Sequence, residues 1–98
     1  MLVHLENEDF NEMIKDDLVI VDFYANWCGP CKMFGPVFEE VGNSNEMNFV
    51  KVDVDKDSDI ARRYGVMSIP TVILFKDGVE VKRYTGFMDK EKLIEFLK

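Results

Sequence analysis

The chain contains two cysteines, and only two residues separate them. Cys28 and Cys31 lie in the run Trp-Cys-Gly-Pro-Cys-Lys at residues 27–32 of the 98-residue sequence. Two thiols at this spacing can act as a structural disulfide, as metal ligands, or as a dithiol that is reversibly oxidised. Each of these chemistries makes a different demand on the rest of the chain.

A redox-active dithiol fits these demands better than the two alternatives. A structural disulfide between these cysteines would close a four-residue ring, which stabilises a fold by only about 2 kcal/mol. A chain of this length already hides roughly 65% of its unfolded surface, so it does not depend on such a bridge. A structural zinc ion needs four ligands, and the chain adds only one histidine, His4, to the two thiols.

The elements on either side of the motif predict where the thiols lie. Residues 18–25 are β-prone and apolar on both faces, which indicates a central strand. A helical pattern starts near Pro30, has Pro36 inside it as an expected kink, and stops at 42–43. Its inward side is predicted to carry an apolar stripe of Met33, Phe34, Val37, Phe38 and Val41. The motif is therefore expected between the carboxyl end of a strand and the amino end of a helix.

That position distinguishes the two sulfurs. Partial positive charge and free amide donors at a helix start stabilise a thiolate, so Cys28 is expected to be the reactive sulfur. Cys31 lies one turn further into the helix and is expected to be more buried and less acidic.

The remaining elements predict an α/β architecture. Asn7 is a candidate cap for a first helix, and residues 49–54 form a second strand, parallel to the first through the intervening helix. A short helix capped by Ser58 is expected to run to residue 64 and to end at Gly65. Strands 71–76 and 79–84 flank Asp77-Gly78, a strong signal for an antiparallel hairpin.

A last helix is expected to complete the fold. Asp89 is its predicted cap, and the side chains expected to pack inward are Leu93, Ile94, Phe96 and Leu97. The sum is a mixed sheet, parallel inside and antiparallel at one edge, with helices on both faces.

Charge and hydropathy exclude several function classes. The formal charge of −7 disfavours nucleic acid as a partner, because phosphates would be repelled. No apolar run approaches the ~20 residues of a membrane helix. The N-terminal residues carry no signal-peptide pattern, so a cytoplasmic location is expected. The alternating acidic residues Asp53, Asp55, Asp57 and Asp59 lack the glycine and glutamate of a calcium loop and predict a solvated segment.

Several separated segments resemble the thioredoxin family, and the resemblance covers nearly all of the chain. The matching segments are residues 21–32 with the CGPC motif, Pro36, 51–53, Ser-Ile-Pro-Thr at 68–71, the hairpin at 77–78 and Gly86. The resemblance implies one domain over residues 1–98 with the thioredoxin fold, a mixed five-stranded sheet flanked by four helices. It also implies a monomeric thiol–disulfide oxidoreductase that reduces protein disulfides and is itself re-reduced by a thioredoxin reductase. No GxGxxG motif is present, so the chain is expected to bind no cofactor of its own, and no metal is expected.

Site roles follow from the resemblance by position. Cys28 resembles the attacking thiol, Cys31 the resolving thiol, Asp22 a buried carboxylate beneath them, and Lys51 an ammonium near that carboxylate. Asp22 could instead face solvent at a strand edge, or be a buried acid that the fold tolerates without a function. Lys51 could simply form a solvated ion pair with Asp53 on its own strand face. A buried carboxylate is costly, which favours a proton-transfer role for Asp22.

The resemblance also implies a substrate-docking surface. Ile69-Pro70 resembles a substrate-binding loop with a cis proline, and the other residues expected to line the rim are Trp27, Gly29, Pro30, Gly86 and Phe87. Two functions remain open from the residues. One is disulfide reduction through a mixed disulfide, and the other is a binding module that uses the same rim with little redox turnover.

Overall fold

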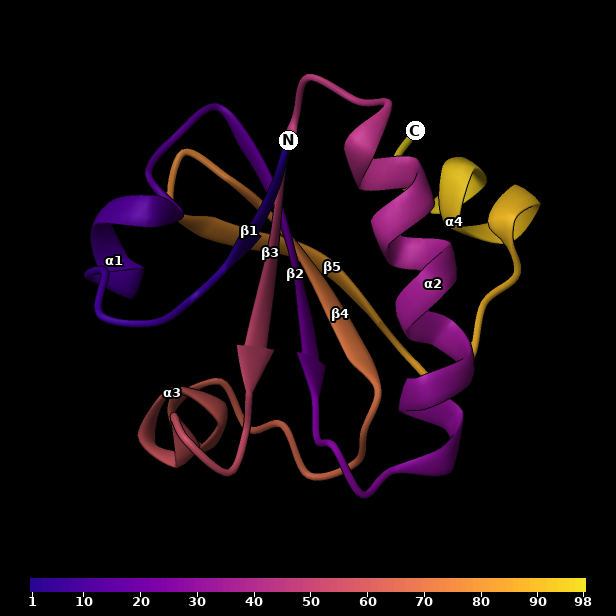
Figure 1. Cartoon of the computed structure of the whole chain (residues 1–98). Helices are drawn as coiled ribbons and strands as arrows, with labels where there is room; N and C mark the ends of the chain where they lie inside the picture. Colours follow the sequence, from indigo (N-terminus) through magenta and orange to yellow (C-terminus); the bar gives the residue numbers. More distant parts are fainter.

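Strand β2, Leu18–Tyr24, lies at the centre of a five-stranded sheet and leads directly to the two cysteines. The computed structural model describes all residues from 1 to 98 (Figure 1). The other strands are β1 (Leu2–His4), β3 (Asn48–Asp53), β4 (Thr71–Lys76) and β5 (Val79–Thr85). The helices are α1 (Phe10–Met13), α2 (Gly29–Asn43), α3 (Ser58–Arg63) and α4 (Lys90–Phe96). None of these helices is long and apolar enough to cross a membrane.

The sheet is mixed, as the sequence predicts. Its strand order is β1-β3-β2-β4-β5. Strands β1, β3 and β2 run parallel to one another, whereas β4 pairs antiparallel with both β2 and β5. The residue patterns alone predict four of the strands. The fifth, β1, is a short edge strand that carries the exposed His4.

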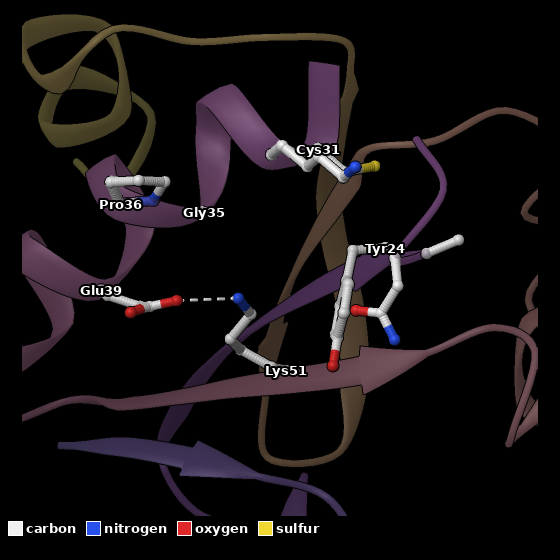
Figure 2. A pocket seen from close by; sticks show the side chains of 9 residues that line it. Tyr24, Cys31, Gly35, Pro36, Glu39 and Lys51 are labelled. Atoms are coloured by element: carbon white, nitrogen blue, oxygen red, sulfur yellow. Dashed lines mark hydrogen bonds and ion pairs between the residues drawn. The ribbon is translucent and has the colours of Figure 1, made fainter. Parts of the chain in front are cut away.

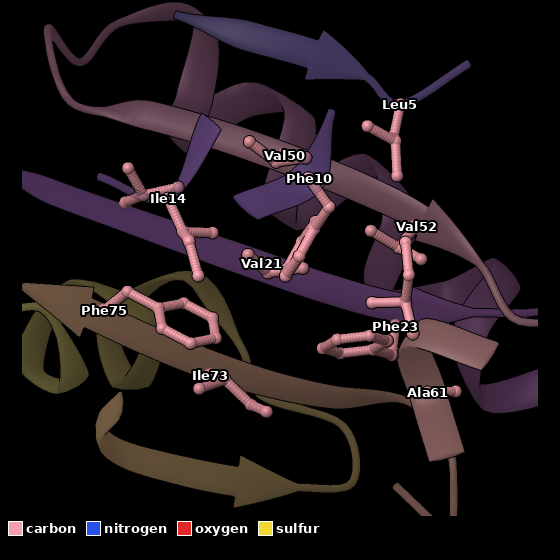
Figure 3. Close-up of a cluster of buried hydrophobic side chains, with 12 residues drawn as sticks. Leu5, Phe10, Ile14, Val21, Phe23, Val50, Val52, Ala61, Ile73 and Phe75 are labelled. Carbon is pink, nitrogen blue, oxygen red and sulfur yellow. The ribbon is translucent and has the colours of Figure 1, made fainter. Parts of the chain in front are cut away.

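Two pairs of helices cover the two faces of the sheet. Helices α1 and α3 lie on one face, and α2 and α4 lie on the other (Figure 1). The face under α1 and α3 is closed by a cluster of twelve buried apolar residues, which includes Phe10, Phe23 and Phe75 (Figure 3). A second cluster of nine residues packs α2 and α4 against the opposite face. The dithiol therefore lies at the edge of the α2 layer, above a firmly packed sheet.

The hairpin and the last helix form as their local sequences predict. Asp77 and Gly78 both have positive φ angles, 52° and 86°, as expected for a two-residue turn between antiparallel strands. Asp89 caps α4 by accepting a hydrogen bond from the Lys92 amide at 2.8 Å.

Two other predicted caps are wrong. Asp9, and not Asn7, caps α1, because its carboxylate accepts the Asn11 amide at 3.0 Å. Ser58 is the first residue of α3 and Asp57 holds the cap position, without a side-chain hydrogen bond to the helix. In both places several capping residue types follow one another, and the sequence does not show which one leaves the helical conformation.

Two predicted core positions are also wrong. Met33 is 66% exposed on α2, and Ile94 is 39% exposed on α4. Each lies at the margin of the apolar stripe of its own helix. The central members of these stripes, Phe34 and Phe38 on α2 and Leu93 on α4, are fully buried. Val37, Phe96 and Leu97 pack only partly against the same cluster. A helical period identifies the buried face and does not define its width.

Candidate redox site

The two thiols meet at the first turn of α2. Cys28 is the N-cap residue of this helix, with extended backbone angles of φ −89° and ψ 116°. Its Sγ accepts a hydrogen bond from the Cys31 amide at 3.3 Å. Both cysteines are free thiols, and each is 5% exposed. The expectation that Cys31 is the more buried of the two is therefore wrong.

Cys28 is covered because another loop crosses it. Its thiol donates a long hydrogen bond of 3.8 Å to the backbone oxygen of Ile69. The Ile69–Pro70 peptide bond is cis, as the resemblance implies. Gly86 in turn donates its amide to the Pro70 oxygen at 2.8 Å. Hydrogen bonds therefore link three segments that are distant in the sequence: Cys28 to Ile69, and Pro70 to Gly86.

An exposed apolar surface surrounds these segments. Trp27 is 69% exposed, and its indole nitrogen donates to Asp55 Oδ2 at 2.9 Å. Phe87 is 42% exposed and contacts Phe34 edge-on. Of the other residues predicted at the rim, Gly29 and Pro30 are exposed, Ile69 and Gly86 are half-buried, and Pro70 is buried. Two methionines that the rim prediction omits, Met33 and Met67, are also exposed next to these segments in the chain.

Asp22 is a buried acid in the middle of β2. It is 1% exposed, and its Oδ1 has no hydrogen-bond partner. Burial raises its pKa from 3.8 to about 7; the Lys51 charge acts to lower this pKa and the Glu39 charge to raise it. The alternative that Asp22 faces solvent is therefore wrong. A carboxyl group with this pKa can take up or release a proton near neutral pH.

Cys31 is held in its protonated form. Burial, followed by its hydrogen bond with Cys28, raises the pKa of the Cys31 thiol to about 12. Without help from a base, the Cys31 side chain is therefore almost entirely a thiol at pH 7. A reaction that uses Cys31 as a nucleophile therefore needs a base.

Lys51 is buried beside the site, but its partner is unexpected. It is 8% exposed and its ammonium binds Glu39 Oε2 at 2.9 Å. The same ammonium lies 4.6 Å from the centre of the Tyr24 ring. Figure 2 shows Lys51 reaching from β3 toward Glu39 on α2, with the dashed line marking the ion pair. Lys51 forms no ion pair with Asp53, so the alternative of a solvated pair on its own strand is wrong.

Sequence reasoning did not single out Glu39, although a signal was present. Cys31, Gly35 and Glu39 are spaced by four residues, so they lie on one side of α2. All three line a cleft of about 230 Å³, together with Tyr24 and Lys51 (Figure 2). Gly35 lies beside the ammonium, since a Cβ at that position would be 3.6 Å from Lys51 Nζ, an ordinary contact distance.

The acidic segment after β3 is only partly solvated. Asp53 is buried and accepts hydrogen bonds from the Asp55 amide at 2.9 Å and from the Asn26 side chain at 3.5 Å. The prediction of a wholly solvated segment is wrong at this residue, which belongs to the end of β3. No three metal-ligating side chains gather anywhere in the chain.

Comparisons with known proteins agree with this geometry. The sequence profile of the thioredoxin family, described as "Thioredoxin", matches residues 1–98. A thioredoxin from Mycoplasmoides gallisepticum is 54% identical over 81 residues, which cover 82% of this chain and 81% of that protein. A thioredoxin from Staphylococcus epidermidis is 45% identical over 98 residues, covering 98% of this chain and 94% of that protein.

Solved structures of thioredoxins have the same fold as this chain. A mutant thioredoxin from Halobacterium salinarum superposes with a TM-score of 0.89 at 34% identity, covering 97% of this chain and 86% of that one. The reduced thioredoxin pre-protein of Schistosoma mansoni gives a TM-score of 0.89 at 38% identity, over 98% and 94% of the two chains. With sequence and fold in agreement over the full length, this chain belongs to the thioredoxin family and is a thiol–disulfide oxidoreductase.

Proposed function

We propose that the protein reduces disulfide bonds of other proteins through Cys28 and Cys31. The observation that supports this most directly is the pair of free thiols at the start of α2, joined by the 3.3 Å contact between the Cys31 amide and Cys28 Sγ. The Cys28 thiolate attacks one sulfur of the substrate disulfide. A mixed disulfide forms and the other substrate sulfur leaves as a thiolate, which takes up a proton.

The second half of the reaction uses Cys31. Its thiolate attacks Cys28 Sγ, the bond between Cys28 and the substrate breaks, and the second substrate thiol leaves. Two electrons pass from the protein to the substrate, and the protein is left with a Cys28–Cys31 disulfide. Because Cys31 is protonated at neutral pH, we propose that Asp22 accepts its proton, directly or through water.

The substrate is proposed to dock on the exposed surface around Cys28. Trp27 and Phe87 supply apolar contact area, and the Ile69–Pro70 segment carries the backbone oxygen that accepts a hydrogen bond from the Cys28 thiol. A thioredoxin reductase is the proposed electron donor that restores the dithiol. One domain spanning residues 1–98 and acting as a monomer contains every residue that this scheme requires.

An insulin reduction assay tests the function. We expect insulin to precipitate when the protein is supplied with a thioredoxin reductase and NADPH, and not when either is omitted. Dithiothreitol as the electron donor separates a mismatched reductase from a protein that has no activity. Absence of turnover with both donors would reject disulfide reduction and favour the binding module.

Brief alkylation of the reduced protein tests the two cysteine roles. We expect iodoacetamide to label Cys28 at least ten times faster than Cys31 near pH 7, because the raised pKa of Cys31 keeps it as a thiol. The two residues are equally buried, each 5% exposed, so their overall burial does not by itself predict such a difference. Peptide mapping reads the result, and equal labelling would contradict the assignment of attacking and resolving thiols.

A further inference from the structure

Two carboxyl groups near the dithiol, those of Asp22 and Glu39, lie close enough to the Lys51 ammonium to interact with its charge. Lys51 lies directly across from Asp22 in the parallel register of β3 and β2. Nevertheless, its only ion-pair partner is Glu39, at 2.9 Å, while Oδ1 of Asp22 has no hydrogen-bond partner. The buried acid is thus left without the contact that its nearest cation could supply.

The surroundings of Lys51 favour the ion pair of its ammonium with Glu39. Glu39 approaches from α2 and remains 41% exposed, so its charge costs little to maintain beside the 8% exposed lysine. The Tyr24 ring lies against the ammonium, and Gly35 lies beside it on α2. These contacts hold the cation on the cleft side of the sheet (Figure 2).

We propose that Glu39 is a positioning residue for the redox reaction: by binding the Lys51 ammonium at the cleft, it keeps this cation from pairing with Asp22 and so keeps Asp22 able to accept the Cys31 proton. This inference rests on the proposed function for its consequence. Its structural part, the hold of Glu39 on Lys51, can be measured without any substrate.

The consequence concerns one proton transfer. The Cys31 S–H bond breaks, its proton passes to the Asp22 carboxylate, and the resulting thiolate attacks Cys28 Sγ and expels the substrate thiolate. A lysine paired tightly with Asp22 would stabilise the carboxylate and make it a weaker base. Holding Lys51 on Glu39 therefore keeps Asp22 basic enough to act near neutral pH.

Few other titratable groups bear on Asp22. Cys31 and Glu39 face it from α2, Lys51 from β3 and Tyr24 from its own strand. On β4, the residue paired with Asp22 is Val72, which does not titrate. Lys32 contributes a further charge at the cleft lining. Of the groups named, only Glu39 is in ion-pair contact with Lys51, which makes it the residue to change.

The test is a titration of Asp22 in the reduced protein, followed by the ¹³C shift of its carboxyl group. In Glu39→Gln the lysine loses its charged partner, and we expect the Asp22 midpoint to fall by about 0.5–1 pH unit. Glu40→Gln is the matched control, because Glu40 is the next residue on α2 and pairs at the surface with Lys90 at 3.0 Å. It should leave the midpoint unchanged. An unchanged midpoint in Glu39→Gln would overturn the proposal.

A double-mutant cycle separates an effect through Lys51 from direct repulsion between the two carboxylates. In a Lys51→Met background the Glu39→Gln substitution should move the Asp22 midpoint by less than half as much. An equal shift in both backgrounds would show that Glu39 does not act through Lys51, and would overturn the proposal.

The rate of mixed-disulfide resolution gives the functional readout. Its pH profile should move to lower pH in Glu39→Gln by the same amount as the Asp22 midpoint, whereas a merely structural role would lower the rate at every pH. If the midpoint falls but insulin is not reduced by the wild type, the proposed function fails and the hold on Lys51 stands. If insulin is reduced and the resolution profile does not move, the positioning role fails and the function stands.

Discussion

The two faces of β2 differ sharply, although both belong to one strand of seven residues. On the face toward α1 and α3, Val19, Val21 and Phe23 are fully buried among apolar side chains (Figure 3). On the face toward α2, Ile20 is followed by Asp22 and then by the half-buried Tyr24. The first face is a closed apolar core. Along the second face the residues change from apolar and buried to half-buried at the polar cleft. The difference shows how a strand can support the fold on one side while holding an unfavourable group on the other.

The packing on the closed face offsets the free-energy cost of burying Asp22 on the open face. Phe10 packs against Phe23, Tyr64 and Phe75, with ring centroids between 5.8 and 6.5 Å apart. Contacts of this kind stabilise a fold beyond the area that they bury. A buried carboxyl group without a hydrogen bond acts in the opposite direction. Substitutions on each face should therefore separate into those that change stability and those that change chemistry.

The largest effect is expected at the dithiol. Cys31→Ser should reduce insulin turnover to background, because the mixed disulfide cannot be resolved without the second thiol. The free energy of unfolding of the reduced protein should change by less than about 1 kcal/mol, since serine is close in size. Trapping of a covalent complex on a non-reducing gel checks the first part, with Cys28→Ser as the control that traps nothing. A Cys31→Ser protein that still turns over would contradict the resolving role.

On the closed face, Phe23→Ala should destabilise the protein by about 3–5 kcal/mol, because it empties a fully buried ring position. Its side chain points away from the cleft, so the Asp22 titration midpoint should stay close to that of the wild type. Urea unfolding and the ¹³C titration measure the two quantities. Phe23→Leu, which fills most of the space, is the milder control. A large change in the Asp22 midpoint would mean that the two faces are not independent.

On the open face, Asp22→Asn should stabilise the protein in a pH-dependent manner. The pKa of Asp22 is about 7 in the folded state against 3.8 for a free side chain, so the wild-type folded state binds more protons between these values and loses stability as pH rises. The advantage of the variant should be absent below about pH 4, should grow to pH 7 and should then level off at no more than about 4 kcal/mol.

The same variant should resolve the mixed disulfide about ten- to a hundredfold more slowly, because Asn cannot accept the Cys31 proton. Urea titrations at several pH values and rapid-quench kinetics measure the two effects. A stability gain that does not depend on pH, together with an unchanged rate, would contradict the role of Asp22.

The smallest effect is expected from oxidation of the dithiol. The Cys28–Cys31 bridge closes a short ring, so the oxidised protein should be more stable than the reduced protein by at most about 2 kcal/mol. Denaturant titrations of both forms, with alkylated protein as a check on reoxidation, measure the difference. A reduced form that is unfolded without denaturant would show that the apolar face does not carry the fold.

The sequence predicts the fold well where local chemistry and long-range packing agree. The apolar run 18–25 becomes β2, the Asp77-Gly78 turn forms, and Asp89 caps α4. It predicts less where several residues offer the same local chemistry, as at the caps of α1 and α3. The edge strand β1 is only three residues long and shows no periodicity of its own.

In the candidate site, too, the sequence predicts residues with distinctive local chemistry and not the contacts that depend on packing. The thiols and the acid are conspicuous because a cysteine pair and a lone aspartate interrupt apolar sequence. The choice of partner for Lys51 depends on a contact across twelve residues, between a strand and a helix. Sequence periodicity places Glu39 and Lys51 on their respective faces, but it does not report which oxygen the ammonium reaches.

The spacing of the two cysteines has a further consequence, because Cys28 caps the helix that carries Cys31. Its sulfur accepts the amide of the third residue after it, which is the usual bond of an N-cap side chain. An extra residue between the thiols would rotate the second one by about 100° around the helix axis and advance it by about 1.5 Å. The capping amide would then belong to a different residue, and the second sulfur would point away from the first. Helix geometry itself therefore fixes the length of this motif at two intervening residues.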